Sequence, residues 1–389
     1  MTRRRTKRAA VIGSLGYSLV NFRLGLMLRL QSHGYEVLAL AADIDAATRR
    51  TLEAHGIAWQ EFPLDRTGIN PLRDLAACRA LWAALRAAAP ELVIAYTMKP
   101  VIYGCLAAQL AAVPARYALF TGLGYSFTAA PPRGRRRLAR AAAVLLHRLA
   151  LRRLTAACCY NGADRDDIRR YRLIPARVPL YQVPGSGVDT AHFRPAPLPA
   201  GPLRFLFAGR LLRSKGLEVL AQAAALLKQR QLAFELQLLG PTGSHPDAVA
   251  PGDLARWQAE GLLTHSGATR DVSPFLQGCH VLVLPTMLRE GIPRSILEAM
   301  ASGRAVITTD APGCSETIKP GTCGLSVPQG DAAALAAAME CFIRDPEQAR
   351  RMGAAARRRA CRRYGLEQAA GRMMQVMGLE PAQAGLAAQ

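Results

Sequence analysis

The sequence predicts an α/β protein with two parallel-sheet domains. At 389 residues the chain is longer than one hydrophobic core usually serves. In both halves, short buried-strand patterns alternate with helical patterns, which is the order that builds parallel sheets. Proline- and glycine-rich segments at residues 184–187 and 193–202 separate the halves. We therefore expect one domain over residues 1–184 and another over residues 185–364, with the helical segment 365–389 able to return to the first.

Positive charge is concentrated in the first half. The net charge is +22, and residues 1–184 carry 28 Lys and Arg against 11 Asp and Glu, a balance of +17. Nucleic acid and an anionic membrane surface both match such a charge. The sequence contains no RNA-recognition, zinc-finger or homeodomain-like pattern, and aromatic residues make up only 6%. The charge therefore favours an anionic membrane as partner over nucleic acid.

Cysteine usage and hydropathy indicate the cellular compartment of the protein. The nine cysteines are odd in number, lack regular spacing and include no CxxC pair, which argues against a disulfide framework and a zinc site. The apolar stretch after the basic residues 1–8 is too short for a signal peptide, and no apolar stretch reaches 18 residues. We expect a protein of the cytoplasmic side, either soluble or peripheral on the membrane.

The first elements form a βαβ unit with a glycine loop. We expect strands at residues 9–12 and 36–42 and a helix between them at 19–32. The loop holds Gly13 and Gly16 but is not a GxGxxG sequence, so a dinucleotide site is disfavoured. Asn21 and Arg23, near the helix start, either face a ligand cleft or form an ordinary polar helix face.

The same alternation continues to residue 120. Strands are expected at residues 58–62, 92–96 and 118–120, with a helix at 71–89. Lys99 follows a strand end and precedes a helix, so it is either a ligand contact or a solvated loop lysine. The turn at residues 121–128 contains Gly122 and Gly124, which allow the backbone to approach a partner closely.

A basic amphipathic helix is expected at residues 133–153, a segment with eight arginines and no acidic residue. Its apolar residues recur at spacings of three and four, while the arginines lie mostly off that stripe. One interpretation is a membrane-surface helix, and the other is a helix packed on its own sheet with a solvated arginine face. The surrounding charge favours the first. The stripe consists of Leu138, Ala142, Leu145 and Leu149, and the arginines are Arg136, Arg137, Arg140 and Arg148.

The second half opens with a pattern suited to binding an anion. A buried strand at residues 203–208 is followed by the loop 209–216, which starts at Gly209 and carries Arg210 and Lys215, and by a helix at 217–229. Two cations, glycine amides and a helix N-terminus then meet at one strand end, an arrangement that fits a diphosphate. The alternative is two ordinary loop cations.

Two carboxylates eight positions apart mark a second loop. Residues 281–284 read as a buried strand, 285–292 as a loop, and Pro293 as the first-turn proline of a helix. Glu290 then lies in the loop and Glu298 about a turn and a half into the helix, whose start suits an anionic or hydroxyl-rich ligand. The alternative is a solvated helix with two surface glutamates.

The remaining strands of this half are expected at residues 234–239, 263–266, 305–308 and 324–327. Glu316 would follow the strand at residues 305–308, at the same edge as Glu290. The tail from residue 331 onward is predicted to be helical, and the arginines at 357–359 and 362–363 to form a solvated charged face.

Three motifs carry a family resemblance. GRLLRSKG at 209–216, the Glu-x7-Glu stretch and GSGVDTAHFRP at 185–195 together resemble the retaining glycosyltransferase family 4. That resemblance implies GT-B architecture, in which two Rossmann-like domains face each other across a cleft. NFR at 21–23, TMKPVIYG at 97–104 and TGLGYSFT at 121–128 are similar to the branch that elongates polyprenyl-diphosphate-linked glycans, which includes N-acetylgalactosaminyltransferases acting on diacetylbacillosaminyl-diphospho-undecaprenol.

The resemblance implies a division of roles. Arg210 and Lys215 would hold the diphosphate of a UDP-sugar, Glu298 would accept hydrogen bonds from the ribose hydroxyls, and Glu290 would lie near the donor sugar. It also implies retention of configuration, with the leaving phosphate taking the acceptor proton and no metal or cofactor taking part. Further donor contacts would come from Gly13, Gly16, Gly209, Gly291, Ile292, Pro293 and Arg294. Acceptor candidates are Lys99, Asn21, Arg23 and Tyr125.

The sequence departs from the family in one respect. Many relatives have a histidine after the fourth strand or in the glycine turn, where this chain has Thr97 and Thr121, so the role of that histidine does not transfer. The Asp-x-Asp strings at residues 43–45 and 164–166 superficially resemble a metal motif, but their positions indicate structural roles. The preferred hypothesis is a transferase peripheral on the inner face of the cytoplasmic membrane. Its alternatives are a GT-B transferase with a soluble acceptor and a basic nucleic-acid-binding protein.

Overall fold

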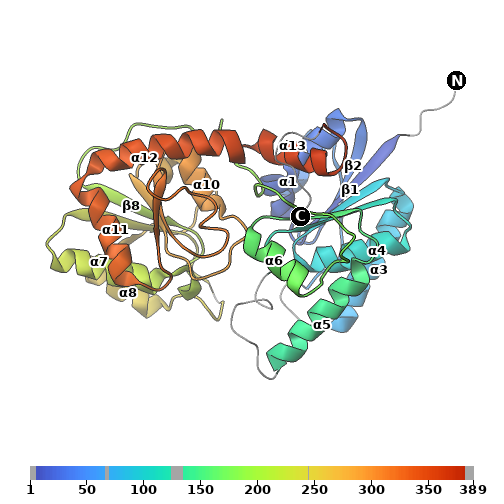
Figure 1. Ribbon diagram of the computed structural model, residues 1–389, viewed down its shortest axis with the longest axis horizontal. Helices are drawn as coiled ribbons and strands as arrows, with labels where there is room; N and C mark the ends of the chain where they lie inside the picture. The colour runs from blue at the N-terminus through green and yellow to red at the C-terminus, as the bar shows by residue number, and fades with distance from the viewer. Residues whose placement is uncertain (1–5, 66–69, 124–134, 244, 382–389) are drawn as a thin grey trace. The chain divides into compact units, whose positions relative to one another are not determined.

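The computed structural model describes residues 6–65, 70–123, 135–243 and 245–381 (Figure 1). The chain divides into two compact units. The first comprises Met1–Ser186 with Glu367–Gln389, and the second comprises Gly187–Leu366. The boundaries expected from the sequence, after residues 184 and 364, lie within two residues of these. Each unit contains one parallel sheet, as expected of this α/β class.

The sheet of the first unit has seven strands in the order β3-β2-β1-β4-β5-β6-β7, and all pairs are parallel. The order reverses between β1 and β4, and such a switch point creates a crevice at the carboxyl edge of a parallel sheet. The short strands β6 and β7 were not predicted, because AACC lacks β-branched residues and LYQ is only three residues long. The strands are β1 Lys7–Ile12, β2 Tyr35–Ala41, β3 Ala58–Glu61, β4 Leu92–Tyr96, β5 Ala115–Phe120, β6 Ala156–Cys159 and β7 Leu180–Gln182.

Helices flank this sheet. The first, α1, begins at Gly16, three residues before the predicted start, because Leu15 at the N-cap position makes no side-chain capping bond that would mark the start. Both Asp-x-Asp strings have structural roles, since Asp45 caps α2 and Asp164 accepts a hydrogen bond from Asn161. The elements are α1 Gly16–Ser32, α2 Ala46–Ala54, α3 Pro71–Ala88, the π-helix η1 Pro100–Gly104, α4 Cys105–Leu110, α5 Arg135–Ala150, α6 Gly162–Arg170 and α13 Leu366–Val376.

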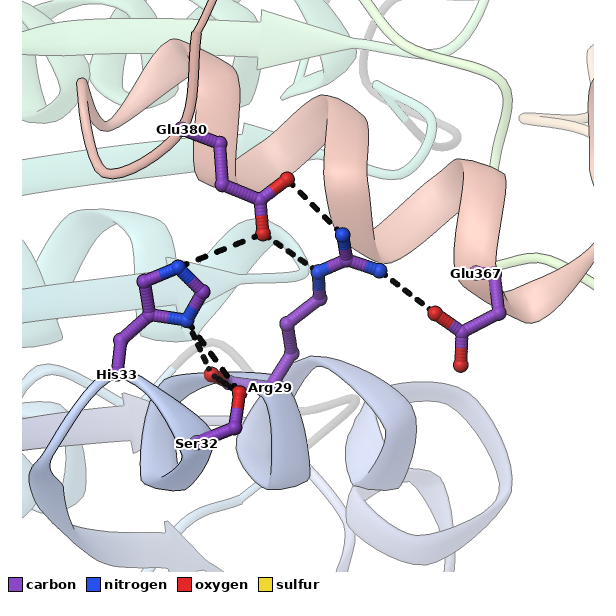
Figure 2. A network of polar contacts seen from close by, with 5 residues as sticks. All are labelled: Arg29, Ser32, His33, Glu367 and Glu380. Carbon is purple, nitrogen blue, oxygen red and sulfur yellow. Dashed lines mark hydrogen bonds and ion pairs between the residues drawn. The ribbon is translucent and has the colours of Figure 1, made fainter.

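The C-terminal segment is fastened to α1 by one arginine. Figure 2 shows Arg29 reaching two glutamates, with Nη1 2.6 Å from Glu367 and Nε 2.6 Å from Glu380. His33 lies 3.6 Å from the same Glu380 carboxylate. The hydrogen bond with Glu380 is the main reason that the pKa of Arg29 is raised. The last helix therefore packs on the first unit through charged contacts.

The second unit has a six-stranded parallel sheet in the order β10-β9-β8-β11-β12-β13. Five of its elements match the predicted bounds residue for residue, because glycine, proline or polar residues end each buried apolar run. The strands are β8 Leu203–Ala208, β9 Phe234–Leu239, β10 Thr264–His265, β11 Val281–Leu284, β12 Ala305–Thr309 and β13 Gly324–Val327. The helices are the 3₁₀ turn η3 Arg213–Lys215, α7 Leu217–Gln229, α8 Pro251–Ala259, α9 Ser273–Gln277, α10 Arg294–Ala301, α11 Ala332–Arg344, α12 Pro346–Arg359 and the π-helix η4 Ala360–Tyr364.

The predicted solvated arginine face on α12 and η4 is partly wrong. Arg357 donates to the carbonyl oxygens of Phe193, Ala301 and Thr190, and Arg359 donates to those of Thr317 and Glu316. These guanidinium groups donate to carbonyl oxygens of loops and of the end of α10, so their charge is used inside the second unit. The three other arginines of the predicted face, at positions 358, 362 and 363, are exposed as expected.

Candidate functional site

Loops at the carboxyl edge of the second sheet contact one another backbone to backbone. A Cβ atom on Gly216 would lie 1.9 Å from the carbonyl oxygen of Pro285, and one on Gly313 would lie 2.2 Å from that of Gly291. Both glycines have positive φ, +79° and +85°, which other residues adopt only with strain. These close approaches fix the loop after β8 and the loop after β12 against the loop after β11.

Two residues predicted from separate motifs meet in these loops. The Nζ of Lys215 donates a hydrogen bond to Oε1 of Glu290, and Thr286 Oγ1 lies 3.4 Å from the same oxygen. Only 14% of the Lys215 side chain and 19% of the Glu290 side chain are exposed. The amide of Glu290 also donates to the carbonyl of Pro312, 3.1 Å away. The site therefore contains a shielded pair of opposite charges.

Arg210 adds a second cation at the end of β8. It is exposed, and its side chain makes no hydrogen bond or ion pair with any residue that the structure describes. The preceding Gly209 is packed closely, since a Cβ on Gly240 would lie 1.8 Å from the Gly209 carbonyl oxygen. This packing fixes the backbone from which Arg210 extends, leaving its guanidinium available to an anion.

Glu298 pairs with the first residue of its own helix. Arg294 Nε donates to Glu298 Oε1 over 3.0 Å, and 15% of the Glu298 side chain is exposed. Burial raises the pKa of Glu298, and the neighbouring Arg294 opposes that rise. Pro293 is the N-cap residue with extended backbone, one position earlier than predicted. The interpretation of Glu290 and Glu298 as two solvated surface glutamates is therefore wrong.

A polar cluster next to Glu298 was missed in the sequence. The Nε2 atom of His192 lies 3.2 Å from Asp271 Oδ1 and 2.9 Å from Ser273 Oγ. Hydrogen bonds from Ser273 are the main reason that the pKa of Asp271 is lowered. The charges of His192 and Asp271 in turn influence the pKa of Glu298. The motif GSGVDTAHFRP contains His192, but the sequence did not show which of its residues faces the site.

Comparisons with known proteins show the family of the chain. Residues 21–184 match the model of the glycosyl transferase 4-like domain, and residues 202–345 match that of glycosyl transferases group 1. The chain belongs to the group 1 glycosyltransferases of GT-B fold. The glycosyltransferase family and the GT-B fold expected from the GRLLRSKG and Glu-x7-Glu motifs are thereby confirmed.

Relatives of this glycosyltransferase are named for several glycans. It is 24% identical to N,N'-diacetylbacillosaminyl-diphospho-undecaprenol alpha-1,3-N-acetylgalactosaminyltransferase of Campylobacter jejuni, over 82% of this chain and 84% of the relative. It is 34% identical to the amylovoran biosynthesis glycosyltransferase AmsK of Erwinia amylovora over 35% of each chain, about a third of that relative. Its fold is similar to that of Anabaena HepE, crystallised with UDP and glucose, at TM-score 0.75, 17% identity and coverage of 96% and 99%.

In the first unit of the glycosyltransferase, the glycine loop serves internal packing. A Cβ on Gly13 would lie 2.3 Å from the hydroxyl oxygen of Tyr96, and one on Gly16 would lie 2.7 Å from the Cα of Ile44. The amide of Gly13 donates to the carbonyl oxygen of Leu40 in β2, and the amide of Gly16 donates to that of Ala42, just after β2. Neither amide is therefore available to a donor phosphate, although the glycines allow the close packing of this edge.

Arg23 is interior, contrary to both alternatives drawn from the sequence. It is 4% exposed, and Nη2 donates to the Tyr160 hydroxyl over 2.6 Å while the guanidinium stacks 4.5 Å from the ring centre of Tyr96. Burial raises the pKa of Tyr96 to about 12, and its hydroxyl lies 2.7 Å from Ser18 Oγ. Asn21 bonds to the carbonyl of Tyr17 within its own helix. Arg23 therefore joins α1 to β4 and to Tyr160, the residue that follows β6.

Lys99 is neither an open ligand contact nor a solvated lysine. Its Nζ donates to Asp74 Oδ1 over 2.7 Å and to the carbonyl of Asp65 over 2.6 Å. The Tyr103 hydroxyl donates to the other oxygen of Asp74 over 2.8 Å, and burial together with this bond raises the pKa of Tyr103. Tyr125, the other acceptor candidate, lies outside the described residues. Lys99 thus neutralises a buried carboxylate at the carboxyl edge of the first sheet.

Thr97 has a strained backbone at the switch point of the first sheet. Its φ is +66°, an uncommon value for a β-branched residue, and its buried Oγ1 has no hydrogen-bond partner within the described residues. The other non-glycine residues with positive φ follow helix ends, except Asp43, which follows β2. The strain thus lies on either side of β1, where sheets of this topology bind ligands.

The apolar stripe of α5 points away from its sheet. Leu138, Leu145 and Leu149 are 73%, 58% and 46% exposed, whereas His147 is buried against Phe120. Burial lowers the pKa of His147 to about 4, which keeps it neutral near pH 7. The leucine stripe, predicted as a membrane contact, is therefore not the face that packs on the sheet.

The arginines of α5 differ in their surroundings. Arg137 is exposed, whereas Arg140 is partly buried beside Tyr171, its Nη1 3.1 Å from the hydroxyl, and Arg148 donates to the carbonyls of Tyr171 and Arg172. The Arg136 side chain lies outside the described residues. No helix in the described ranges has the length and apolar character to cross a bilayer, and those ranges contain no group of three or more metal-binding side chains.

Proposed function

We propose that this glycosyltransferase transfers an N-acetylhexosamine, with retention of configuration, from a UDP-sugar to a polyprenyl-diphosphate-linked glycan. The observation that carries the proposal is the Lys215–Glu290 pair beside Arg210 at the carboxyl edge of the second sheet. A diphosphate is the ligand class that best matches two cations at a strand-to-helix loop. The UDP held by the similar fold of HepE supports the nucleotide.

Each charged residue has a distinct role in this scheme. Lys215 transfers its hydrogen bond from Glu290 to the diphosphate, and Arg210 adds a second positive charge that stabilises the leaving group. Glu290, released from Lys215, accepts a hydrogen bond from a sugar hydroxyl. Glu298 accepts from the ribose hydroxyls. The transfer then forms the acceptor C–O bond on the face that the diphosphate leaves, and a phosphate oxygen takes the acceptor proton, so the scheme requires no nucleophilic side chain, metal or cofactor.

Three observations support a lipid-linked acceptor. The Campylobacter relative is named for an undecaprenyl-diphosphate substrate. The first unit's chain segment to residue 184 has a charge balance of +17, which attracts an anionic membrane surface. The leucine stripe of α5 is exposed and lies beside arginine, as in helices that lie in a membrane interface. We place the enzyme at the inner face of the cytoplasmic membrane.

The test begins with a panel of UDP-sugars. Thermal melting with UDP, UDP-N-acetylglucosamine, UDP-N-acetylgalactosamine, UDP-glucose and UDP-galactose should show stabilisation by UDP compounds and none by ADP or GDP. The stabilising sugar is then supplied with polyprenyl-diphosphate glycans, and the anomeric configuration of the product is read by NMR. Absence of stabilisation by every UDP compound would refute the donor site. Equal transfer to a lipid-free glycan would refute the lipid acceptor, and an inverted product would refute retention.

A further inference from the structure

The exposed side of α3 has the same composition as the exposed side of α5. Leu72 and Leu75 are 78% and 66% exposed in the first turns of α3. The other exposed residues of the helix are proline, alanine and arginine. Its one acidic residue, Asp74, is buried and paired with Lys99. α3 itself therefore presents leucine and arginine with no exposed acidic residue of its own, while Arg73 pairs with Asp65 of the preceding segment over 3.6 Å.

The two helices cover the same face of the first sheet. Cys78 and Leu81 of α3, Ala150 of α5 and the next residue, Leu151, belong to one core cluster, together with residues of η1 and α4, which contact both helices. Figure 1 shows α3, α4 and α5 grouped around this sheet. Since the inner sides of these helices meet the same face of the sheet, their outer sides turn the same way, away from it.

All strongly exposed leucines of the described residues lie on these three helices. We call these six leucines the α3–α5 face: Leu72, Leu75, Leu110, Leu138, Leu145 and Leu149. Isolated apolar side chains are ordinary on a protein surface, but six leucines on neighbouring helices indicate an interaction surface. Because arginines accompany these leucines and exposed acids are absent from α3, α4 and α5, a partner with both an apolar and an anionic layer fits this face.

We propose that the α3–α5 face docks on an anionic lipid bilayer, with α3 entering the interface beside α5. The inference rests on the proposed function in one respect, the lipid-linked acceptor. The leucines enter the boundary between headgroups and acyl chains, and the arginines pair with anionic headgroups. A second copy of the chain would bring like charges together, and nucleic acid would leave the leucines without an apolar partner. Two helices also fix the orientation of the domain on the membrane, which one helix does not.

The test uses the full-length protein and flotation with two kinds of vesicle at about 0.1 M salt. One kind contains phosphatidylcholine alone, and the other contains about one third phosphatidylglycerol. Wild type should float with the anionic vesicles. The double variant Leu72→Ser/Leu75→Ser should bind them about tenfold or more weakly, because two apolar side chains no longer enter the boundary between headgroups and acyl chains. Tyr17→Ser, which removes a half-exposed apolar residue from α1 outside the α3–α5 face, should bind as wild type does.

Two further variants separate the outcomes. Leu145→Ser/Leu149→Ser tests α5 alone, and Arg79→Glu reverses an exposed charge on α3 without removing a leucine. Loss of binding in the α5 variant, with wild-type binding in both α3 variants, would overturn the role of α3. Salt-sensitive DNA binding by a protein that does not float would overturn the bilayer as partner.

The failure of this inference is distinguishable from that of the proposed function. UDP stabilisation is measured on the same preparations, and it depends on the second unit. If wild-type protein is stabilised by UDP but binds neither kind of vesicle, the docking face is refuted and the donor site is still supported. Because all substituted side chains are exposed, the melting temperatures of the variants should match that of wild type. If a leucine variant does not fold, vesicle binding by Arg79→Glu tests the role of α3 instead.

Discussion

Lys215 donates a hydrogen bond to Glu290, so the two charges that the sequence placed in different loops neutralise each other. Both side chains are mostly buried, and only close packing of the loops after β8 and β11 brings them together. In the proposed function, an incoming diphosphate competes with the Glu290 carboxylate for the Lys215 ammonium group. The pair would then provide a cation for the phosphate and release a carboxylate for the sugar.

Lys215 and Glu290 variants should affect different properties. Lys215→Ala should weaken UDP binding about tenfold to a hundredfold, since hydrogen bonds to charged groups contribute about 1.5–3 kcal/mol. Glu290→Gln should keep or strengthen UDP affinity, because Lys215 no longer has a competing carboxylate, and should slow sugar transfer. Calorimetric titration with UDP measures the UDP affinity of both variants. Lys228→Ala, on the last turn of α7, is the control and should change neither; equal losses of UDP affinity in Lys215→Ala and Glu290→Gln would contradict these separate roles.

Glu298 should make UDP binding sensitive to acid. Burial raises its pKa above the ordinary 4.5, so it gains a proton at a higher pH than a solvated glutamate and then accepts fewer hydrogen bonds from ribose. UDP affinity of wild type should fall as pH decreases toward that raised pKa. Phosphate itself titrates near about 6, so the informative quantity is the difference from Glu298→Gln, whose profile should lack this component.

The same shift has a consequence for stability. A carboxyl group whose pKa is raised on folding stabilises the protein below its unfolded pKa, and this contribution is lost as pH rises through the folded pKa. At neutral pH, Glu298→Gln should therefore melt no lower than wild type even though UDP binds it more weakly. A clear drop in melting temperature at pH 7 would show that the charged form is needed for folding.

Gly313 should be required for activity through its contact with the Glu290 loop. In Gly313→Ala the new Cβ would meet the carbonyl oxygens of Glu290 and Gly291 at 2.3 and 2.2 Å, so that loop must move. We expect transfer to fall about a hundredfold, the scale associated with a displacement of about 1 Å in an active site. Gly321→Ala is a matched control, because its φ of +75° imposes similar strain but its Cβ would meet no atom within 4 Å. Similar activity in both variants would contradict the positioning role.

Lys99 and Asp74 should stabilise the first unit as a pair. Lys99→Ala or Asp74→Ala alone leaves a largely buried charge without its partner, and each should lower the melting temperature; breaking such a pair costs about 3–5 kcal/mol in buried cases. The double variant should lose less than the sum of the single losses. Additive losses would indicate that the two side chains act independently.

The elements of the second unit were the most predictable from sequence. The bounds of β8, β9, β11, β13 and α7 were predicted to the residue, because their buried apolar runs end at glycine, proline or polar residues. The bounds of α1, β5 and β10 were less well predicted, since no capping residue or β-branched run marks them. Strands β6 and β7 were missed because their few residues carry too weak a pattern.

The sequence did not predict which side chains pair with each other. Arg23 and Lys99 both follow strand ends or helix starts, which is why they were candidates for ligand contact, yet each is bound inside the first unit, to Tyr160 and to Asp74. His192 was overlooked since its neighbours Asp271 and Ser273 lie about eighty positions away in sequence. Local patterns report which residues lie at a sheet edge, not which way their side chains turn.

The sequence by itself determined the two parallel sheets, the family, the loop positions of Arg210, Lys215 and Glu290, and the position of Glu298 in a helix, because strand periodicity and motif spacing are local properties of the chain. The tertiary structure decided that Lys215 binds Glu290, that Glu298 is buried against Arg294, and that the leucines of α3 and α5 remain exposed. These outcomes depend on distances between segments far apart in sequence. Those distances are set by the packing of whole loops and helices, which no short stretch of residues encodes.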